Sequence, residues 1–588
     1  MKPIFLSLFF AASLSLNAEE IFPKPGWTDK PNPLASRDAV PGGELTAFGF
    51  QSPKSFNYYL DNNSFSADLF SALYESLLTL NPLSPDYEPG LAEKWSISDD
   101  KRTFTFWLNP KARWSDGRPI TAADIKWTFD TIMNPANLTG PHKVGLEKFT
   151  SPVVVDDQCI RFTTTEVHWR NLGAVGSLQI LPRHAFEKLD FNKVNFEFPV
   201  VSGPYRLGTI REGISVTLER RADWWNRNAA ASRGTANFQT LKFKFFESQE
   251  TAFEAFKKGE LDLFPIYMAR LWMNETSGDK FSRNWIIRQK ISNYDPIGFQ
   301  GFAMNMRRPP FDDVRVRKAL CHLVNRERMN ATLMYNQYFL HRSYFEDLYD
   351  KAHACPNPLT AFDKDQARRL LAEAGWKANP ATGLLEKGGH PFRFRFLERD
   401  SSAGKFLSIV AEDLRDVGID MQIDSKDQAA WTRDMDEFNF DMTWAAFGSS
   451  LFKDPEGMWS SREADRKCGT NITGFKDKTV DELIERQKPM FDVAARHALC
   501  REIDRIAFNQ YPYVLLWNIN YKRLVYWNKF GTPSTILGKF NNESGAYWYW
   551  WYDADAADDL KNAMGKNLPL PRHPAEVSFD AAFTTPAE

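Results

Sequence analysis

The chain has 588 residues, of which 43% are hydrophobic, 25% charged and 14% aromatic. A single hydrophobic core stops growing well below this length, so we expect two or three domains. The 73 basic and 75 acidic residues give a net charge of -2 without a block rich in Lys and Arg, which excludes the basic footprint typical of nucleic-acid-binding proteins.

Residues 1–18 have the pattern of a cleaved signal peptide. Lys2 precedes an apolar run from Ile4 to Leu16, and Ala18 supplies a small residue at the expected cut. The run is too short to span a membrane, and we expect no transmembrane segment after it, because no later stretch is apolar enough. Since no Cys follows the run, we expect a periplasmic protein without a lipid anchor.

The mature chain begins with an irregular arm and a first strand. Pro, Asn and Asp are frequent between residues 22 and 41, whereas residues 41–50 predict a strand. A polar and aromatic loop, residues 52–64, leads into a helix predicted at 66–81. The apolar stripe of this helix is expected to run from Leu69 to Leu80.

A strand, a turn and a capped helix are predicted between residues 103 and 132. Apolar and polar residues alternate over 103–108 with the period of two that fits a β-strand. Turn-forming residues at 115–119 break the strand pattern. Thr121 is placed to cap the following helix, with Asp124 at the helix's positive end.

Two further units are predicted before the middle of the chain. Residues 151–165 indicate a hairpin that turns at Asp156 and Asp157. Residues 241–264 indicate a strand, a helix ended by Gly259 and a second strand. This crossover is of the kind that builds parallel sheets.

The second half contains capped helices. Asp312 or Asp313 caps a helix that follows a Pro-Pro pair, and Asp363 with Gln366 three residues later has the capping-box pattern. Gly375 lies just past the end of the second of these helices, where a left-handed residue is favoured. The first of these helices carries one apolar face, formed by Val316, Leu320, Leu323 and Val324.

The chain has five cysteines, which cannot all pair with one another. One or two disulfides fit an oxidising compartment, most readily among the four in the second half, but the sequence does not give the pairing. There is no CxxC motif, so neither a redox site nor a zinc site is indicated. The cysteines are Cys159, Cys321, Cys355, Cys468 and Cys500.

The amino-acid sequences of several segments resemble those of one protein family. Residues 92–130 closely resemble the signature region of the family 5 extracellular solute-binding proteins, the oligopeptide-, dipeptide- and nickel-binding receptors of bacterial ABC importers. Residues 202–207, 220–226 and 301–329 are similar to further hallmarks of this family. The resemblance extends in order over roughly residues 41–530, and residues 438–450, with the missing lipidation Cys, look most like the Yej-type oligopeptide-binding branch.

The resemblance implies an α/β fold of the two-lobed periplasmic-binding-protein type, class II-like and of the Venus-flytrap kind, with an additional accessory α+β domain. The chain would then cross twice between the lobes. The expected limits are residues 19–66, 199–290 and 518–588 for lobe I, 67–198 for the accessory domain and 291–517 for lobe II.

The resemblance also places a ligand-binding loop at residues 446–450. Gly448 would let backbones approach closely and Phe447 would offer a stacking face, although a simple strand-to-helix turn explains the same residues. In the oligopeptide receptors an Asp shortly after this loop holds the amino terminus of the peptide. Leu451 stands at that position here, and the nearest acid is Asp454. The sequence therefore leaves open whether Asp454 forms the equivalent salt bridge.

The residues expected to contact ligand come from this loop and from loops that face the same cleft by analogy. A basic residue is also expected to clamp the carboxylate of a short peptide, but nothing selects one of the 73. The candidates are Tyr58, Tyr59, Tyr344, Phe447, Gly448, Ser449, Ser450, Asp454 and Trp517.

No catalytic constellation is found in the sequence. There is no GxSxG, HExxH, Walker or GxGxxG motif, no two of the nine His are four residues apart, and nothing selects a pair of carboxylates. We therefore expect no catalysis, no cofactor and no metal. The first hypothesis is a monomeric periplasmic receptor that delivers oligopeptides to an inner-membrane ABC permease, whose partner subunits hydrolyse ATP.

Two alternatives remain open. The same receptor scaffold serves an oligosaccharide, a nickel chelate or another solute, and fold similarity cannot separate these cargoes. A secreted hydrolase acting on polymers would also suit the aromatic content, but the missing constellation disfavours it.

Overall fold

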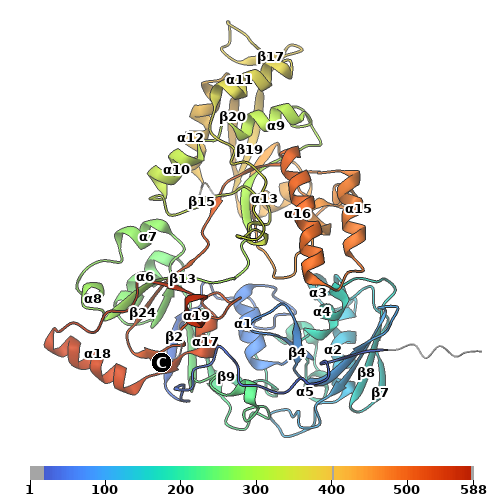
Figure 1. Cartoon of the computed structure of the whole chain (residues 1–588), viewed down its shortest axis with the longest axis vertical. Coiled ribbons are helices and arrows are strands. Elements are labelled where there is room, and N and C mark those ends of the chain that lie inside the picture. The colour runs from blue at the N-terminus through green and yellow to red at the C-terminus, as the bar shows by residue number, and fades with distance from the viewer. Residues whose placement is uncertain (1–18, 400, 402, 585–588) are drawn as a thin grey trace, which may run out of the picture.

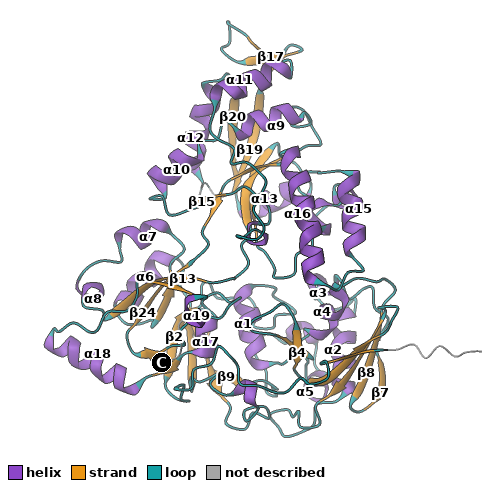
Figure 2. Cartoon of the chain, in the orientation of Figure 1, coloured by secondary structure: helices purple, strands orange, loops and turns teal. Residues whose placement is uncertain are grey.

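The computed structural model describes residues 19–399, 401 and 403–584. The predicted signal peptide, residues 1–18, lies outside the described residues. Figures 1 and 2 show a tapered upper part that stands on a broader lower part. Three larger β-sheets organise these parts, and helices cover them.

Lobe I, in the lower part, is built on an eight-stranded sheet in which β2 (Glu44–Phe48) is central. β11 (Thr240–Lys244) and β12 (Leu263–Pro265) both pair with β2 in parallel, on its two sides. The predicted crossover is therefore confirmed, with α6 (Gln249–Lys257) between the two strands. Gly259 follows this helix at φ +86°, in the left-handed region that glycine adopts without strain.

The remaining strands of this sheet and the helices beside it complete lobe I. The strands are β9 (Tyr205–Arg211), β10 (Ser215–Arg220), β13 (Ile286–Ser292), β24 (Lys522–Trp527) and β27 (Glu576–Ser578). The helices are α1 (Ser64–Leu73), α7 (Ala269–Asn274), α8 (Asp279–Ser282), α17 (Gly545–Tyr549), α18 (Ala554–Lys566) and α19 (Ala581–Thr584).

The accessory part is built on a second sheet, with strand order β1-β5-β6-β8-β7. The predicted hairpin is confirmed as β7 and β8, and the chain's first strand, β1, pairs with β5 of this sheet. Thr121 and Asp124 form a capping box at the start of α2 (Ala122–Met133), as expected. The other bounds are β1 (Glu20–Phe22), β5 (Ala92–Ile97), β6 (Thr103–Leu108), β7 (Val153–Asp156), β8 (Cys159–Thr163), α3 (Gly140–Lys143), α4 (Arg170–Gly176) and α5 (Arg183–Phe186).

Lobe II, the upper part, is built on a third sheet, with strand order β20-β19-β21-β14-β22. Asp313 caps α9 (Val314–Cys321), and Asp363 caps α11 (Lys364–Glu373) by accepting the backbone N–H of Gln366. Gly375 lies just past the end of α11, with φ +91°. The strands are β14 (Phe299–Met304), β19 (Arg393–Arg399), β20 (Asp420–Lys426), β21 (Met442–Phe447) and β22 (Tyr513–Leu515). The helices are α9 (Val314–Cys321), α10 (Arg326–Leu333), α11 (Lys364–Glu373), α12 (Gly404–Arg415), α13 (Gln428–Asp436), α14 (Glu456–Trp459), α15 (Lys478–Gln487) and α16 (Val493–Gln510).

The prediction of one helix over residues 66–81 is wrong in its second half. The helix α1 ends at Leu73, and residues 78–80 form strand β3 (Leu78–Leu80), paired with β4 (Tyr87–Pro89). The carbonyl of Leu77 accepts the N–H of Gly90 instead of continuing a helix. A tertiary hydrogen-bond partner therefore overrides the apolar periodicity.

The hydrophobic cores show which parts are packed together. Leu45 of lobe I and Phe104 of the accessory part belong to one continuous cluster of buried residues, whereas lobe II has separate clusters around Phe302 and Phe299. The chain passes between lobes I and II after β13 and again after β23 (Trp517–Asn518). Lobe I and the accessory part therefore form one packed unit, and the predicted domain limits remain a prediction.

All five cysteines lie within the described residues and are free, so the structure contains none of the disulfides considered from the sequence. Cys159, Cys321 and Cys500 are buried. None of the helices in the described ranges has the length and apolar character needed to cross a membrane.

Candidate functional site

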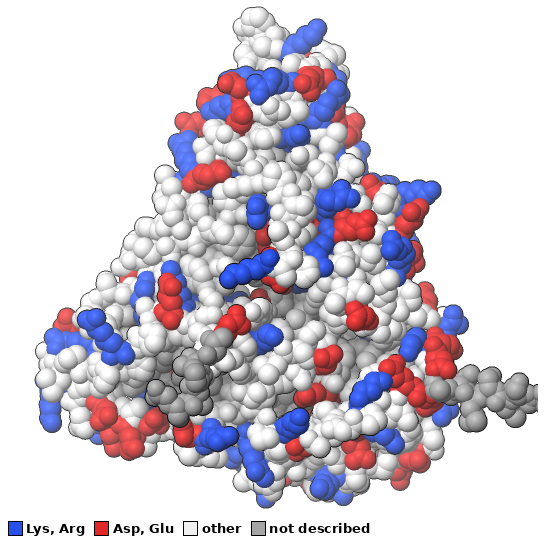
Figure 3. Space-filling view, in the orientation of Figure 1, with Lys and Arg blue, Asp and Glu red and all other residues white. Residues whose placement is uncertain are grey.

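A cavity of about 1180 Å³ lies between the accessory part and lobe II. The accessory part contributes Tyr87 and His168 to its lining, lobe II contributes Phe452 and Asp454, and the N-terminal arm contributes Trp27. Figure 3 shows one face of the molecule, hollowed between the upper and lower parts, with acidic and basic side chains interspersed over it. A cavity of this volume with mixed polar and aromatic walls suits a ligand larger than an amino acid.

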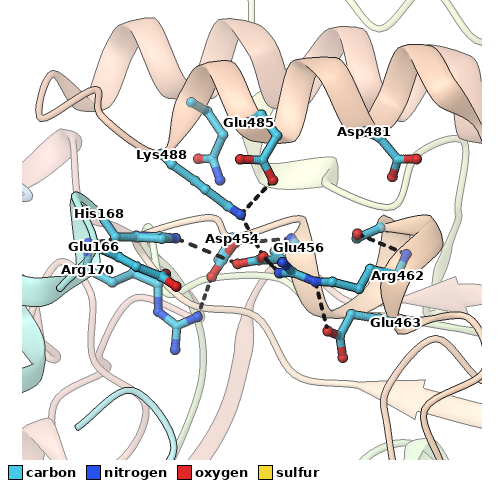
Figure 4. Close-up of polar contacts among 12 residues, drawn as sticks. Glu166, His168, Arg170, Asp454, Glu456, Arg462, Glu463, Asp481, Glu485 and Lys488 are labelled. Atoms are coloured by element: carbon cyan, nitrogen blue, oxygen red, sulfur yellow. Dashed lines mark hydrogen bonds and ion pairs between the residues drawn. The ribbon is translucent and has the colours of Figure 1, made fainter. Parts of the chain in front are cut away.

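Charged side chains from the accessory part and lobe II meet at the edge of this cavity (Figure 4). Arg170 Nη1 lies 2.5 Å from Asp454 Oδ2, and Lys488 Nζ lies 2.8 Å from Glu456 Oε1. His168 Nε2 lies 3.8 Å from Glu456 Oε2. Contact with His168 and Lys488 holds the pKa of Glu456 far below its ordinary value, so this carboxylate stays ionised.

Aromatic side chains join the same two parts beside the charged cluster. Trp169 donates its backbone N–H to Lys488 O at 2.9 Å, and its indole ring lies 4.0 Å from the guanidinium carbon of Arg496. Phe452 stacks on Tyr87 with ring centroids 5.7 Å apart. The accessory part and lobe II are therefore in direct contact on this side of the molecule.

The loop after β21 is held by a buried lysine. Lys453 Nζ donates to Ser449 Oγ at 2.5 Å, to Ser450 O at 2.7 Å and to Asp347 Oδ2 at 2.6 Å. Asp454 follows in the chain and accepts the N–H of Glu456, which starts α14. These bonds fix the direction in which the Asp454 carboxylate points.

Three of these side chains have the composition of a metal site. Ligand atoms of His168, Asp454 and Glu456 lie within 4.8 Å of one another, and His168 is only 3% exposed. However, Arg170 is paired with Asp454, and Lys488 is paired with Glu456, as is Arg462. A divalent cation would have to displace these cations, so we assign no metal to this cluster.

A second hollow, of about 460 Å³, lies on lobe II beside β21. Its lining includes residues 443–447 of β21 and the rings of Phe406 and Trp431. β21 pairs with β14 up to Phe447 but with β19 only at Met442 and Thr443. Within the described residues, the last part of β21 is thus a strand edge that borders the hollow.

The predicted ligand-contact residues fall into two groups in the structure. Tyr59, Tyr344 and Trp517 are buried in the hydrophobic cores and act there as packing residues. Tyr58 is half-buried against the ring of His142. Contact of these four side chains with ligand remains a prediction.

The other predicted residues line or border the two cavities. Phe447 lines the hollow beside β21, whereas Ser450 and Asp454 line the larger cavity. Gly448 and Ser449 connect them, and the hydroxyl of Ser449 is engaged by Lys453. The segment therefore runs from one cavity to the other, and its contact with ligand remains a prediction.

Several residues of the cluster were not selected from the sequence. They carry no motif, and Arg170 and Asp454 are 284 residues apart in the chain. Their contacts identify them only in the folded structure, because these contacts join segments that are far apart in the sequence. They are His168, Trp169, Arg170, Lys453, Glu456 and Lys488.

Comparison with known proteins supports the resemblance noted from the sequence. Residues 86–467 match the model of the bacterial extracellular solute-binding proteins, family 5 Middle. The chain is 27% identical over 577 residues to the uncharacterized protein YejA of Escherichia coli strain K12, covering 91% of this chain and 92% of that protein. It is also 27% identical over 511 residues to the probable peptide-binding protein YejA of Agrobacterium fabrum, covering 79% and 83% of the two chains.

A solved structure agrees with the observed fold. The oligopeptide-binding protein AppA of Bacillus subtilis, in complex with a nonapeptide, superposes with a TM-score of 0.67. The match covers 88% of this chain and 100% of AppA at 19% identity. The two-lobed α/β fold and the likeness to Yej-type proteins are thereby confirmed, and since the family model spans most of the chain, the chain belongs to the family 5 bacterial extracellular solute-binding proteins.

Proposed function

We propose that this protein captures oligopeptides in the periplasm and delivers them to an inner-membrane ABC permease, without changing the peptide covalently. The observation that carries the proposal is the strand edge at the end of β21, which borders one cavity and leads through residues 448–454 to a second. An extended peptide can add to such an edge through main-chain hydrogen bonds, which every sequence offers. The likeness to YejA and to AppA supports this cargo.

The arrangement of the lobes suits a closing receptor. Lobe I and the accessory part share one core, lobe II has its own, and two crossings join them. Closure of lobe II over a peptide excludes water, which strengthens each hydrogen bond to the ligand. The cavity beside the strand edge and the larger one reached through residues 448–454 would accept varied side chains, so affinity would come mainly from the peptide backbone and its termini.

Asp454 is the residue that we assign to the amino terminus of the peptide. Its carboxylate lies on the cavity wall and is paired with Arg170, whose half-exposed side chain can turn toward solvent. We expect Asp454→Asn to weaken peptide binding at least several-fold, because a charge-assisted hydrogen bond to the ammonium group is lost. Isothermal titration calorimetry with peptides of three to nine residues measures this change.

A matched variant separates the local effect from a general effect of charge. Asp465→Asn also removes one carboxylate from lobe II, but Asp465 is exposed and paired with Lys476. This variant should bind peptides like the unaltered protein. Equal affinities for Asp454→Asn and the unaltered protein would remove Asp454 from the site.

The cargo itself is tested by the ligands that the protein retains. Mass spectrometry of small molecules released on denaturation should find peptides, and a mixed peptide pool should raise the melting midpoint, because a ligand of the folded state stabilises that state. Sugars or a nickel chelate in their place would keep the receptor role but change the cargo. Chromatography of the incubated peptides should show no cleavage, and turnover would favour the hydrolase alternative.

A further inference from the structure

Lobe I contains a separate cavity of about 100 Å³ between α1 and α17. This volume holds several water molecules or the head group of a side chain. Eight of its seventeen lining residues are aromatic. They are Phe48, Phe50, Phe65, Tyr205, Phe243, Tyr267, Tyr547 and Trp548.

Two carboxylates line this aromatic cavity. Asp68 comes from α1, and Glu543 precedes α17 and is 7% exposed. Glu543 accepts a hydrogen bond from the hydroxyl of Tyr267 at 2.5 Å. Among the described residues, no Lys, Arg or His forms an ion pair with Asp68 or Glu543, which sets them apart from the paired carboxylates of the larger cavity.

Loss of solvation raises the pKa of both acids. Loss of solvation around the carboxylate, together with the charge of Glu543, raises the pKa of Asp68 to about 7, although the residue as a whole is exposed. Burial also raises the pKa of Glu543 above its ordinary value. The cation that acts on Glu543 is Lys522, which is already paired with Asp295. A cation brought by a ligand would therefore be stabilised here.

The cavity lies close to the junction between the lobes. Tyr267, one of its wall residues, accepts a hydrogen bond at its carbonyl from the hydroxyl of Tyr338 in lobe II, at 3.2 Å. Lys522 and Asp295 lie on the two crossings between the lobes. A ligand held between the lobes can thus present a side chain to this cavity.

We propose that this aromatic cavity receives the cationic side chain of a Lys or Arg residue of the bound peptide. Aromatic faces pack against the methylene stem and attract the charged end, and Asp68 and Glu543 supply the opposite charge. The inference rests on the proposed function, because it assigns a preference to the peptide cargo. It is a subsite of lobe I, distinct from the contact assigned to Asp454 in lobe II.

The test compares peptides that differ in one charge. In one series of peptides, Lys is placed at each position in turn. Each Lys peptide is compared with a second peptide that has norleucine at the same position, because norleucine has a similar length but no charge. Every peptide is prepared with a free and with an acetylated amino terminus. Isothermal titration calorimetry at pH 8 should show about tenfold tighter binding of a Lys peptide than of its norleucine partner at one or more positions. Acetylation should leave that ratio unchanged.

Variants of Asp68 and Glu543 test whether the preference for Lys peptides arises in this cavity. Asp68→Asn and Glu543→Gln should each reduce the Lys preference toward unity while leaving the affinity for the norleucine peptide unchanged, which also shows that the variants are folded. Asp558→Asn, on the exposed face of α18, removes one carboxylate from lobe I without touching the cavity and should keep the preference. The Lys preference of the unaltered protein should also fall as the pH is lowered from 8 to 6, because Asp68 becomes protonated.

The possible failures are distinguishable. If Lys and norleucine peptides bind equally at every position, or if the preference survives in both acid variants, the subsite is refuted and the oligopeptide receptor stands. A preference that follows the free amino terminus instead of Lys also refutes it. If none of the peptides binds, the proposed function fails and the subsite fails with it.

Discussion

Replacing Trp169 by Ala is expected to release the accessory part from lobe II. The indole N–H donates to Gln487 Oε1 at 3.0 Å, the backbone N–H donates to Lys488 O, and the ring lies against Arg496. Removing a buried aromatic anchor of this kind costs about 2–4 kcal/mol of contact free energy. Without peptide, small-angle X-ray scattering should show a larger radius of gyration, and the affinity for peptides should fall because closure loses part of its driving force.

The control keeps an aromatic ring but removes the indole N–H and part of the ring area. Trp169→Phe should retain most of the contact with Arg496 and show a smaller change in both measurements. Identical scattering for Trp169→Ala and the unaltered protein would mean that the contact does not hold the lobes together. We would then expect the charged pairs around Asp454 to hold the accessory part against lobe II.

Replacing Asp504 by Ala is expected to destabilise lobe II strongly. Asp504 lies on α16 and is 0% exposed, and its carboxylate accepts hydrogen bonds from four groups. Its loss would leave buried donors without an acceptor, which costs about 3–5 kcal/mol in total. Chemical denaturation followed by Trp fluorescence should show this loss. The donors are Ser343 Oγ at 2.9 Å, Tyr344 N at 2.8 Å, Tyr349 Oη at 2.8 Å and Asn357 Nδ2 at 3.0 Å.

An isosteric variant distinguishes lost hydrogen bonds from lost volume. Asp504→Asn keeps the shape and one oxygen acceptor, so its free energy of unfolding should lie between those of Asp504→Ala and the unaltered protein. If Asp504→Ala unfolds at nearly the same denaturant concentration as the unaltered protein, the network does not hold the loop of residues 343–357 in place. Peptide affinity provides a separate measurement, because Asp504 lines neither of the two cavities next to β21.

The sequence by itself determined the local elements and the family. The caps at Thr121 and Asp363 and the glycine after α6 were predicted correctly, and the cap of α9 was narrowed to Asp312 or Asp313, because each depends on residues within one or two turns of the same helix. The same local patterns, in the same order, carried the resemblance that the family model confirms. The segment from Phe447 to Asp454 was also selected in this way.

Only the tertiary structure decided where helix α1 ends and what surrounds the site. The helix ends at Leu73, whose carbonyl accepts the N–H groups of Ser202 and Gly203, partners that periodicity cannot show. His168 and Arg170 reach Asp454 only when two parts of the chain dock. The pKa of Asp68 is raised by loss of solvation and by the charge of Glu543, and both arise only in the folded chain. Burial and long-range pairing are set by the whole chain, so no local pattern encodes them.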